Sequence, residues 1–200
     1  MKLKCYVDYD STLNTLAEEW CIWASYKFKT IVTTKDIKDW YWMENTFGHN
    51  VNFFWKTPLT YSLDIVTKRR GAKTFLNTLK HMYGKDNVAI ITHSWQGTEE
   101  EKDNQIKRFF GDIKVIHEED KASVTKDGIL IDDRPSTVEK HCKRNDKLGI
   151  VFTNDDLYGW STKEHVENYE QVKNKMVFKR SYEDILDFLY KFNLMGGVNG

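Results

Sequence analysis

The sequence predicts an α/β fold, a doubly wound (Rossmann-like) and mostly parallel sheet with a small helical cap inserted after the first strand. Short apolar segments rich in valine and isoleucine recur along the chain, and amphipathic segments separate them. The 200 residues suit one domain, and 40% apolar residues can fill its core. The gap between the first two apolar segments is too long for one crossover, so an insertion is expected there.

The predicted strands are short and mostly apolar, without alternation of apolar and polar residues. This pattern is typical of strands that are buried on both faces of a parallel sheet. Along the chain, the strands are expected at 3–8, 88–92, 113–116, 128–132 and 148–152.

Four helices are predicted between and after these strands. Apolar residues recur along 71–83 and 181–192 at the three- and four-residue spacing of a helix. The segment 98–110 opens on a threonine and a glutamate run, and 135–144 opens on a proline, as first helical turns often do. Strands that alternate with helices in this way indicate right-handed crossovers in a doubly wound sheet.

Residues 14–70 are predicted to form the aromatic-rich helical cap, and residues 1–13 with 71–200 the α/β core. Within the cap, helices are expected at 14–28 and 34–42. Five of the seven tryptophans lie in the first 55 residues of the chain. Such large flat side chains either fill the interior of the cap or contact a flat ligand.

Charge and composition exclude several classes of protein. Thirty basic and thirty acidic side chains cancel, whereas nucleic-acid binders usually carry a basic excess, so no stable nucleic-acid binding is expected. The chain has no apolar run near the roughly 18 residues of a membrane span, and its first residues lack the apolar stretch of a secretion signal. Three scattered cysteines favour buried thiols. We therefore expect a cytoplasmic protein without membrane contact; its oligomeric state stays open, a homodimer included.

Polar side chains follow three of the predicted strands at their carboxyl ends. In an open α/β sheet these ends share one rim, and ligands bind outside it. Carboxylates gathered there would repel one another without a cation, and an all-oxygen set of ligands favours Mg²⁺ over zinc. The carboxylates in question are Asp8, Asp10, Asp132 and Asp133.

A Mg²⁺ ion with spare coordination positions would bind phosphate oxygens. Thr92 and Ser94, together with backbone N–H groups before the next helix, would donate hydrogen bonds to those oxygens. Lys121 can reach the same oxygens, and Lys126, closer to the next strand, competes with it for this role. His93 either orients a substrate or fills the turn.

Four segments resemble the motifs of the haloacid-dehalogenase superfamily of phosphotransferases. Residues 8–12 (DYDST) resemble its first motif, DxDx[TV]; residues 90–92 (IIT) its second; Lys121 its third; and residues 131–135 (IDDRP) its fourth. Within the superfamily the chain looks most like the 5'(3')-deoxyribonucleotidases, which often carry an IDDRP strand end, a preceding DK pair, and an aromatic-Trp-x-x-Pro stretch that leads into a Gly-Ala helix. The last three features correspond here to residues 120–121, 54–58 and 71–72.

This resemblance implies a phosphoric monoester hydrolase of the 5'-nucleotidase type that works in two steps. Asp8 would attack phosphorus and form an aspartyl-phosphate. Asp10 would protonate the leaving nucleoside oxygen and then activate the water that hydrolyses the intermediate. Thr92 and Lys121 would neutralise the phosphoryl group as it is transferred.

The resemblance also implies a ligand set for the Mg²⁺ cofactor. The ion would be held by an Asp8 carboxylate oxygen, the Asp10 backbone carbonyl and one of Asp132 and Asp133. Which member of this pair binds the ion directly stays open. The other would contact the residues that bind the ion rather than the ion itself.

The implied substrate is a deoxyribonucleoside monophosphate, and aromatic side chains of the cap would stack on its base. Stacking of a base on an aromatic side chain is worth about 1–3 kcal/mol. The preference for a 5' or a 3' phosphate stays open. Two alternatives remain: a phosphatase for a sugar phosphate or a nucleic-acid 3'-phosphate end, and a non-catalytic binding module on the same fold. The candidates for stacking are Trp40, Trp42, Phe53, Phe54 and Trp55.

Overall fold

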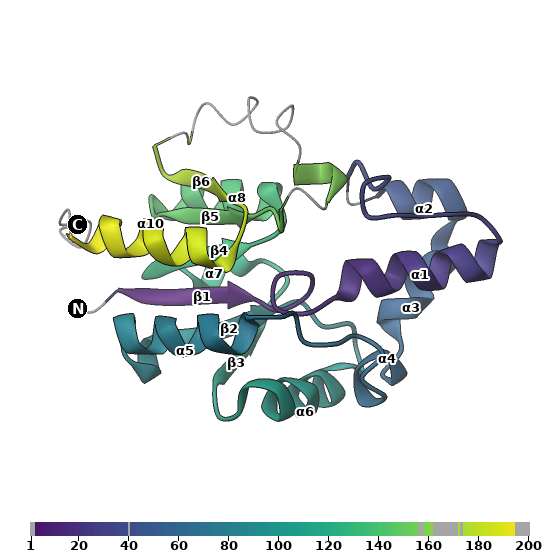
Figure 1. Cartoon of the computed structure of the whole chain (residues 1–200), viewed down its shortest axis with the longest axis horizontal. Helices are drawn as coiled ribbons and strands as arrows, with labels where there is room; N and C mark the ends of the chain where they lie inside the picture. Colours follow the sequence, from purple (N-terminus) through teal and green to yellow (C-terminus); the bar gives the residue numbers. More distant parts are fainter. Residues whose placement is uncertain (1–2, 40, 156–157, 162–171, 173, 195–200) are drawn as a thin grey trace.

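A six-stranded parallel sheet forms the centre of the computed structural model, which describes residues 3–39, 41–155, 158–161, 172 and 174–194. The strand order is β3-β2-β1-β4-β5-β6 (Figure 1). The chain therefore runs outward from β1 in one direction, then returns to β4 and runs outward in the other, which makes this a doubly wound sheet, as predicted. The strands are β1 (Lys4–Asp8), β2 (Val88–Thr92), β3 (Lys114–His117), β4 (Gly128–Asp132), β5 (Gly149–Phe152) and β6 (Met176–Lys179).

Amphipathic helices cover the sheet and close its core. The main apolar cluster joins β1, β2, β4 and β5 to α5, α6 and α10, while α8 packs on β4, β5 and β6. None of the described helices combines the length and the apolar character that crossing a bilayer requires. The core helices are α5 (Ala72–Tyr83), α6 (Glu99–Phe110), α7 (Lys121–Val124), α8 (Pro135–Asn145) and α10 (Tyr182–Leu194), with the 3-10 turns η2 (Lys85–Asn87) and η3 (Gly159–Ser161).

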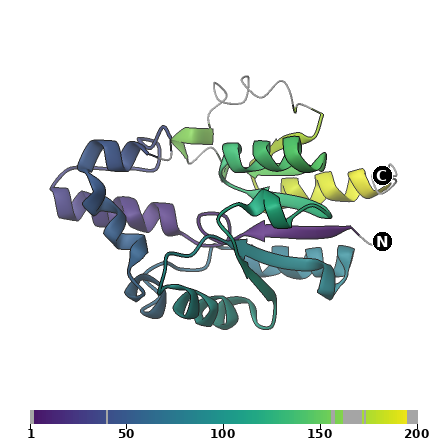
Figure 2. The ribbon, with the colours of Figure 1, turned by 180° about the vertical axis from the view of Figure 1, so that it is seen from behind.

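The helices between β1 and α5 lie beyond the arrowhead end of β1 (Figures 1 and 2). Their buried faces form an apolar cluster separate from that of the sheet, which we call the cap cluster. Its buried members are Leu16, Trp20, Cys21, Ala24, Val32, Ile37, Met43, Val51, Phe54 and Val66. The elements are α1 (Leu16–Phe28), α2 (Trp42–Phe47), η1 (His49–Asn52), α3 (Phe53–Lys56) and α4 (Leu59–Ser62).

The prediction of a helix over residues 34–42 is wrong. The described part of this segment forms turns, and α2 begins only at Trp42. The Asp36 carboxylate accepts hydrogen bonds from the backbone N–H and the hydroxyl of Thr33, each at 2.7 Å. Such a side-chain bond to the backbone stabilises a turn in competition with a helix. Trp40 lies outside the described residues.

Two antiparallel segments connect the cap helices to the sheet. Asn14 and Lys68 form a β-bridge beside the backbone hydrogen bonds Thr15 N–H to Thr67 O (3.0 Å) and Arg69 N–H to Leu13 O (3.0 Å). The chain thus leaves and re-enters the core through one paired connection, next to the carboxyl end of β1.

Candidate active site

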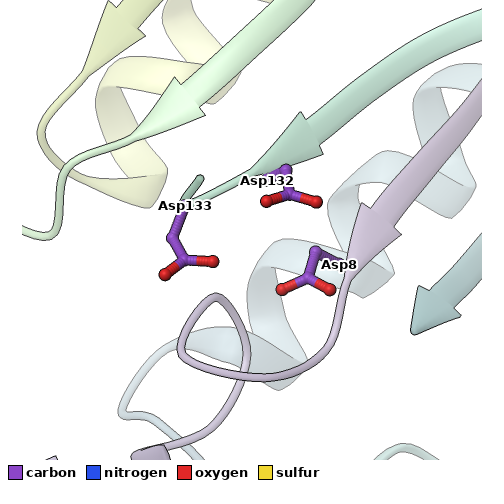
Figure 3. Close-up of side chains that lie close together, drawn as sticks. All are labelled: Asp8, Asp132 and Asp133. Atoms are coloured by element: carbon purple, nitrogen blue, oxygen red, sulfur yellow. The ribbon is translucent and has the colours of Figure 1, made fainter. Parts of the chain in front are cut away.

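Three buried carboxylates meet where β1 and β4 end (Figure 3). The two strands are parallel neighbours, with Val7 paired to Ile131, so Asp8 and Asp132 end at the same rim. Asp133 follows directly, and one oxygen from each of the three carboxylates lies within 4.8 Å of the others. This is the point at which the winding of the sheet reverses, where α/β folds bind their ligands.

The three carboxylates carry more negative charge than their surroundings compensate. Burial raises the pKa of Asp8 to about 7, although Lys121 acts in the opposite direction. Burial, together with the charges of Asp132 and Asp8, also raises the pKa of Asp133 well above its ordinary value. A bound cation would relieve both effects.

Lys121 is the basic residue that reaches this cluster. Its ammonium donates hydrogen bonds to Asp8 Oδ1 and, at 2.7 Å, to Asp132 Oδ2. Burial disfavours the charged amine, but the charges of Asp132 and Asp8 outweigh burial and hold the pKa of Lys121 above its ordinary value. Lys126, the competitor in the sequence, is exposed and does not line the site.

The surroundings of Asp133 fit a hard divalent cation. Among the described residues, Asp133 Oδ2 is buried without a hydrogen-bond partner, and Oδ1 accepts a long bond of 3.5 Å from the Thr12 hydroxyl. A buried carboxylate oxygen without a donor is unfavourable unless a cation compensates it. Because all of the available ligand atoms are oxygens, the residues suit Mg²⁺ rather than a metal that prefers sulfur or nitrogen.

The side chain of Asp10 is held apart from the three carboxylates. Its Oδ2 accepts hydrogen bonds from Lys102 Nζ (2.7 Å) and the Thr92 hydroxyl (3.3 Å). Its Oδ1 accepts from Asn14 Nδ2 (3.0 Å) and the Tyr61 hydroxyl (3.4 Å). Asp10 lines the same cavity as Asp8, so the two carboxylates of the first motif face one space in different surroundings.

Lys102 is a residue that the sequence analysis missed. It follows the run of glutamates at 99–101, which suggests a solvated helix face, yet its side chain is 2% exposed. Lys102 shares a four-residue spacing with Ile106 and Phe110, both buried. A lysine in register with an apolar stripe was the signal available in the sequence.

The cavity beside these groups has a volume of about 380 Å³ and lies between the cap and the ends of the strands. This is within the usual range for small-ligand sites, about 300–1,000 Å³. Acidic and basic side chains line the wall of the cavity that faces the ends of the strands. The aromatic residues that line it are Trp20, Tyr41, Trp55, Tyr61, Trp95 and Trp160.

Among the predicted stacking residues that the structure describes, Trp55 lines the cavity. Its ring meets that of Trp95 edge to face, with centroids 6.0 Å apart. The ammonium of Lys56 lies 4.0 Å from the centroid of the Trp95 ring. This contact joins α3 of the cap to the loop after β2, so the aromatic wall has contributions from both parts of the chain.

The other predicted stacking residues that the structure describes do not line the cavity. Phe54 is buried in the cap cluster, where its ring lies 5.7 Å from that of Trp23. Trp42 packs edge to face on Phe47 at 6.1 Å, against the same cluster, and Phe53 is exposed. In one-turn helices such as α3, neighbouring residues point in different directions, which the composition of the segment does not reveal.

Thr92, at the end of β2, and the two residues that follow it contact different parts of the molecule. Thr92 is buried and donates its hydroxyl to Asp10. His93 lines the cavity, and burial lowers its pKa. Ser94 Oγ lies 2.7 Å from Nδ1 of His117 and does not line the cavity. The structure therefore places His93 at the cavity, Thr92 beside Asp10 but not on the cavity wall, and Ser94 toward β3.

The comparisons with known proteins find structures of similar fold but no protein of closely similar sequence. No protein-family model and no curated protein matches the chain. A HAD family hydrolase from Deinococcus radiodurans R1, solved with bound phosphate and sodium, is similar at a TM-score of 0.62 and 12% identity, over 96% of each chain.

Two further solved structures are similar over most of their length. A hydrolase from Pseudomonas syringae matches at a TM-score of 0.57 and 11% identity, over 96% of this chain and 99% of the other. A protein described as a predicted phosphatase from Clostridium acetobutylicum matches at a TM-score of 0.51 and 16% identity, over 96% and 99%. The chain therefore has the fold of these hydrolases.

Proposed function

We propose that this protein is a Mg²⁺-dependent phosphomonoesterase that hydrolyses deoxyribonucleoside monophosphates through an aspartyl-phosphate. The observation that carries the proposal is the buried cluster of Asp8, Asp132 and Asp133, held against Lys121 at the switch point of the sheet. Its likeness in fold to a HAD family hydrolase solved with phosphate supports the same chemistry.

The three clustered carboxylates would hold the cation, which when bound offsets the repulsion between them and a phosphate dianion. A free oxygen of Asp8 attacks phosphorus as the bond from phosphorus to the ester oxygen breaks. Asp10, in its protonated form, gives its proton to the leaving oxygen, so that the nucleoside departs as an alcohol. Lys121, between Asp8 and Asp132, offsets the charge on the transferred group.

The second step restores the enzyme. Asp10, now a carboxylate, takes a proton from a water molecule whose oxygen attacks the phosphorus of the aspartyl-phosphate. The bond between Asp8 and phosphorus breaks, and inorganic phosphate leaves. Both steps use one position of Asp10, which lines the same cavity as Asp8.

Residues 14–70 act in this proposal as a cap that excludes bulk water and supplies the aromatic wall. Trp55 from the cap and Trp95 from the core stand together at the cavity. A nucleobase offers a flat face for such side chains, whereas a sugar phosphate does not. This contrast favours a nucleotide over the alternative phosphomonoesters.

The Asp8→Asn variant tests the reaction type. With Mg²⁺ present, wild-type protein should hydrolyse 4-nitrophenyl phosphate, and Asp8→Asn should lose the activity by at least about 1,000-fold because the nucleophile is gone. Asp112→Asn, which changes a carboxylate that is 91% exposed, should retain it. Equal hydrolysis by wild type and Asp8→Asn would show that Asp8 is not the nucleophile, and no hydrolysis by wild type would favour the binding-module alternative.

The Trp55→Ala variant tests the substrate class. Loss of one stacking contact should raise KM for thymidine 5'-monophosphate about tenfold while leaving 4-nitrophenyl phosphate nearly unchanged. Phe53→Ala, on the same helix and 70% exposed, is the matched control. If a sugar phosphate is the best substrate of a panel and Trp55→Ala does not affect its KM, the nucleotide assignment is wrong.

A further inference from the structure

Lys102 places a buried positive charge beside the proposed acid–base residue. Its ammonium lies 2.7 Å from Asp10 Oδ2, 2.7 Å from the backbone oxygen of His93 and 3.3 Å from Thr92 Oγ1. A lysine ammonium has three N–H donors, so each of them has an acceptor here. The contacts fix the ammonium between the ends of β1 and β2.

The cap also meets Lys102 at this point. The ring centroid of Tyr61, on α4, lies 4.7 Å from the Lys102 ammonium, and the Tyr61 hydroxyl donates to Asp10 Oδ1. Gln105, one turn further along α6, donates its amide to the backbone oxygens of Tyr61 (3.2 Å) and Val66 (2.9 Å). The helix that carries Lys102 is therefore fastened to the cap beside Asp10.

Asp10 needs such support because it lies in a loop rather than in a strand. The next residue, Ser11, has a left-handed backbone with φ of 61°. The hydrogen bonds that the Asp10 carboxylate accepts from Asn14, Tyr61 and Thr92 come from neutral groups, whereas that from Lys102 is charge-assisted and hence the strongest. Rotation of the carboxylate would separate a buried ion pair, which is unfavourable.

We propose that Lys102 is a positioning residue that holds the Asp10 carboxyl group where it exchanges a proton with the ester oxygen. The inference rests on the proposed function. The two buried lysines then serve different carboxylates, since Lys121 contacts Asp8 and Asp132 while Lys102 contacts Asp10.

The dependence of the rate on the leaving group tests this role. We would measure kcat/KM, which covers the steps through phosphoryl transfer, for a series of aryl phosphates from 4-nitrophenyl to 4-methoxyphenyl phosphate. A nitrophenolate leaves without a proton, whereas a more basic phenolate needs one. Lys102→Met should lower kcat/KM for the most basic leaving group about 100-fold, the low end of a general acid's contribution, and by less than about fivefold for 4-nitrophenyl phosphate.

Two further variants separate positioning from folding. Lys107→Met, an exposed position on α6, should leave the whole series unchanged. In the Asp10→Asn background, Lys102→Met should cause no additional loss for basic leaving groups, because the group that Lys102 positions has already been removed. If Lys102→Met does not fold, Lys102→Gln, which keeps a hydrogen-bond donor, is measured in the same series.

The outcomes distinguish this inference from the function on which it rests. An equal loss across the series in the Lys102 variant, or an additional loss for basic leaving groups in the Asp10→Asn background, would overturn the positioning role and leave the phosphatase intact. Wild-type protein that hydrolyses none of the esters would overturn the proposed function, and the inference with it.

Discussion

Asp132 and Asp133 are adjacent in the sequence, but their carboxylates have different surroundings. Both oxygens of Asp132 accept hydrogen bonds, Oδ1 from the Arg134 backbone N–H at 2.8 Å and Oδ2 from Lys121. Asp133 Oδ2 is buried and has no donor in the part of the chain that the structure describes. The proposed cation would therefore matter most to Asp133, while Asp132 also accepts the hydrogen bond from Lys121.

Removal of the Asp133 charge should weaken metal binding. Mg²⁺ at about 100 times its Kd should stabilise wild-type protein by about 2.7 kcal/mol, which raises Tm by about 5 °C or more. We expect Asp133→Asn to lose most of this shift in a thermal melt with and without Mg²⁺. The control Asp112→Asn should keep it, and an undiminished shift in Asp133→Asn would contradict the assignment.

The sequence could predict where these carboxylates meet but not how they divide their roles. Strands that end in Asp8 and Asp132 bring both to one rim in a parallel sheet, whatever the details of packing. Which oxygen of which aspartate lacks a donor depends on the loop after β4 and on Lys121, and no local pattern encodes these contacts.

Among the elements, α7 shows how a short helix places a functional side chain. It has only four residues, too few for a periodic pattern, and the sequence did not predict it. The Thr125 hydroxyl donates to the backbone oxygen of Lys121 at 2.9 Å, and it lies 2.8 Å from Nδ1 of His141 on α8. Nε2 of His141 lies 3.2 Å from the backbone oxygen of Leu148. His141 therefore anchors the helix that carries Lys121.

The burial of His141 predicts a loss of stability in acid. Burial lowers the pKa of His141 from 6.5 to about 4. Between these values the unfolded chain binds a proton that the folded chain does not, so the free energy of unfolding decreases as the pH falls from 6.5 to about 4. The total loss from this group is about 3 kcal/mol.

Urea unfolding of wild type and His141→Gln across this pH range measures that contribution. The wild type should lose stability more steeply than the variant below pH 6.5, and the two should run parallel above it. Curves that stay parallel throughout the range would show that His141 is not the group responsible.

The sequence predicted the bounds of some helices and strands better than others, because only some of them carry a clear apolar pattern. The bounds of β2 and β4 agree with the prediction because a buried strand is a continuous apolar run. No helix forms over the described part of 34–42 before α2 begins at Trp42, because side-chain bonds from Asp36 to Thr33 stabilise a turn there. The edge strand β6 was missed because its four residues are mostly half-buried and show no clear pattern.

At the scale of the whole molecule, Arg69 fastens the cap to the core. Its guanidinium donates to the backbone oxygens of Ser11 (3.0 Å) and Asn14 (2.9 Å) and to both carboxylate oxygens of Glu18. The side chains of Arg69 and Glu18 are 11% and 23% exposed. This ion pair lies within residues 14–70 and holds the guanidinium beside the loop that carries Asp10, where it donates to Ser11 O and to the Tyr158 hydroxyl (2.6 Å) of the core.

Arg69→Met should destabilise the whole chain because it removes the cation that is paired with Glu18 and a donor to the backbone oxygens of Ser11 and Asn14. We expect the free energy of unfolding in urea to decrease by about 3 kcal/mol, as for other buried pairs that lose one partner. Arg70→Met, at the exposed neighbouring position, should change it by less than about 0.5 kcal/mol. Equal effects of the two variants would contradict the role of Arg69.

How the cap and the core meet is the part that the sequence did not reveal. Trp95 and Lys102 belong to the core, yet both reach the cavity beside residues of the cap. Their positions depend on the way that α4 and α6 pack together, through bonds such as that from Gln105 to the backbone of Tyr61. Such contacts between distant segments leave no periodic pattern in either one.

Trapping of the reaction intermediate tests the central role of Asp8 most directly. Wild-type protein that is hydrolysing a phosphomonoester with Mg²⁺ would be quenched in acid, digested and analysed by mass spectrometry. We expect one phosphoryl group on the peptide that contains Asp8, lost on treatment with hydroxylamine and absent from Asp8→Asn. Steady turnover with no phosphoryl group on that peptide, or with the group on another residue such as His93, would contradict the proposed chemistry.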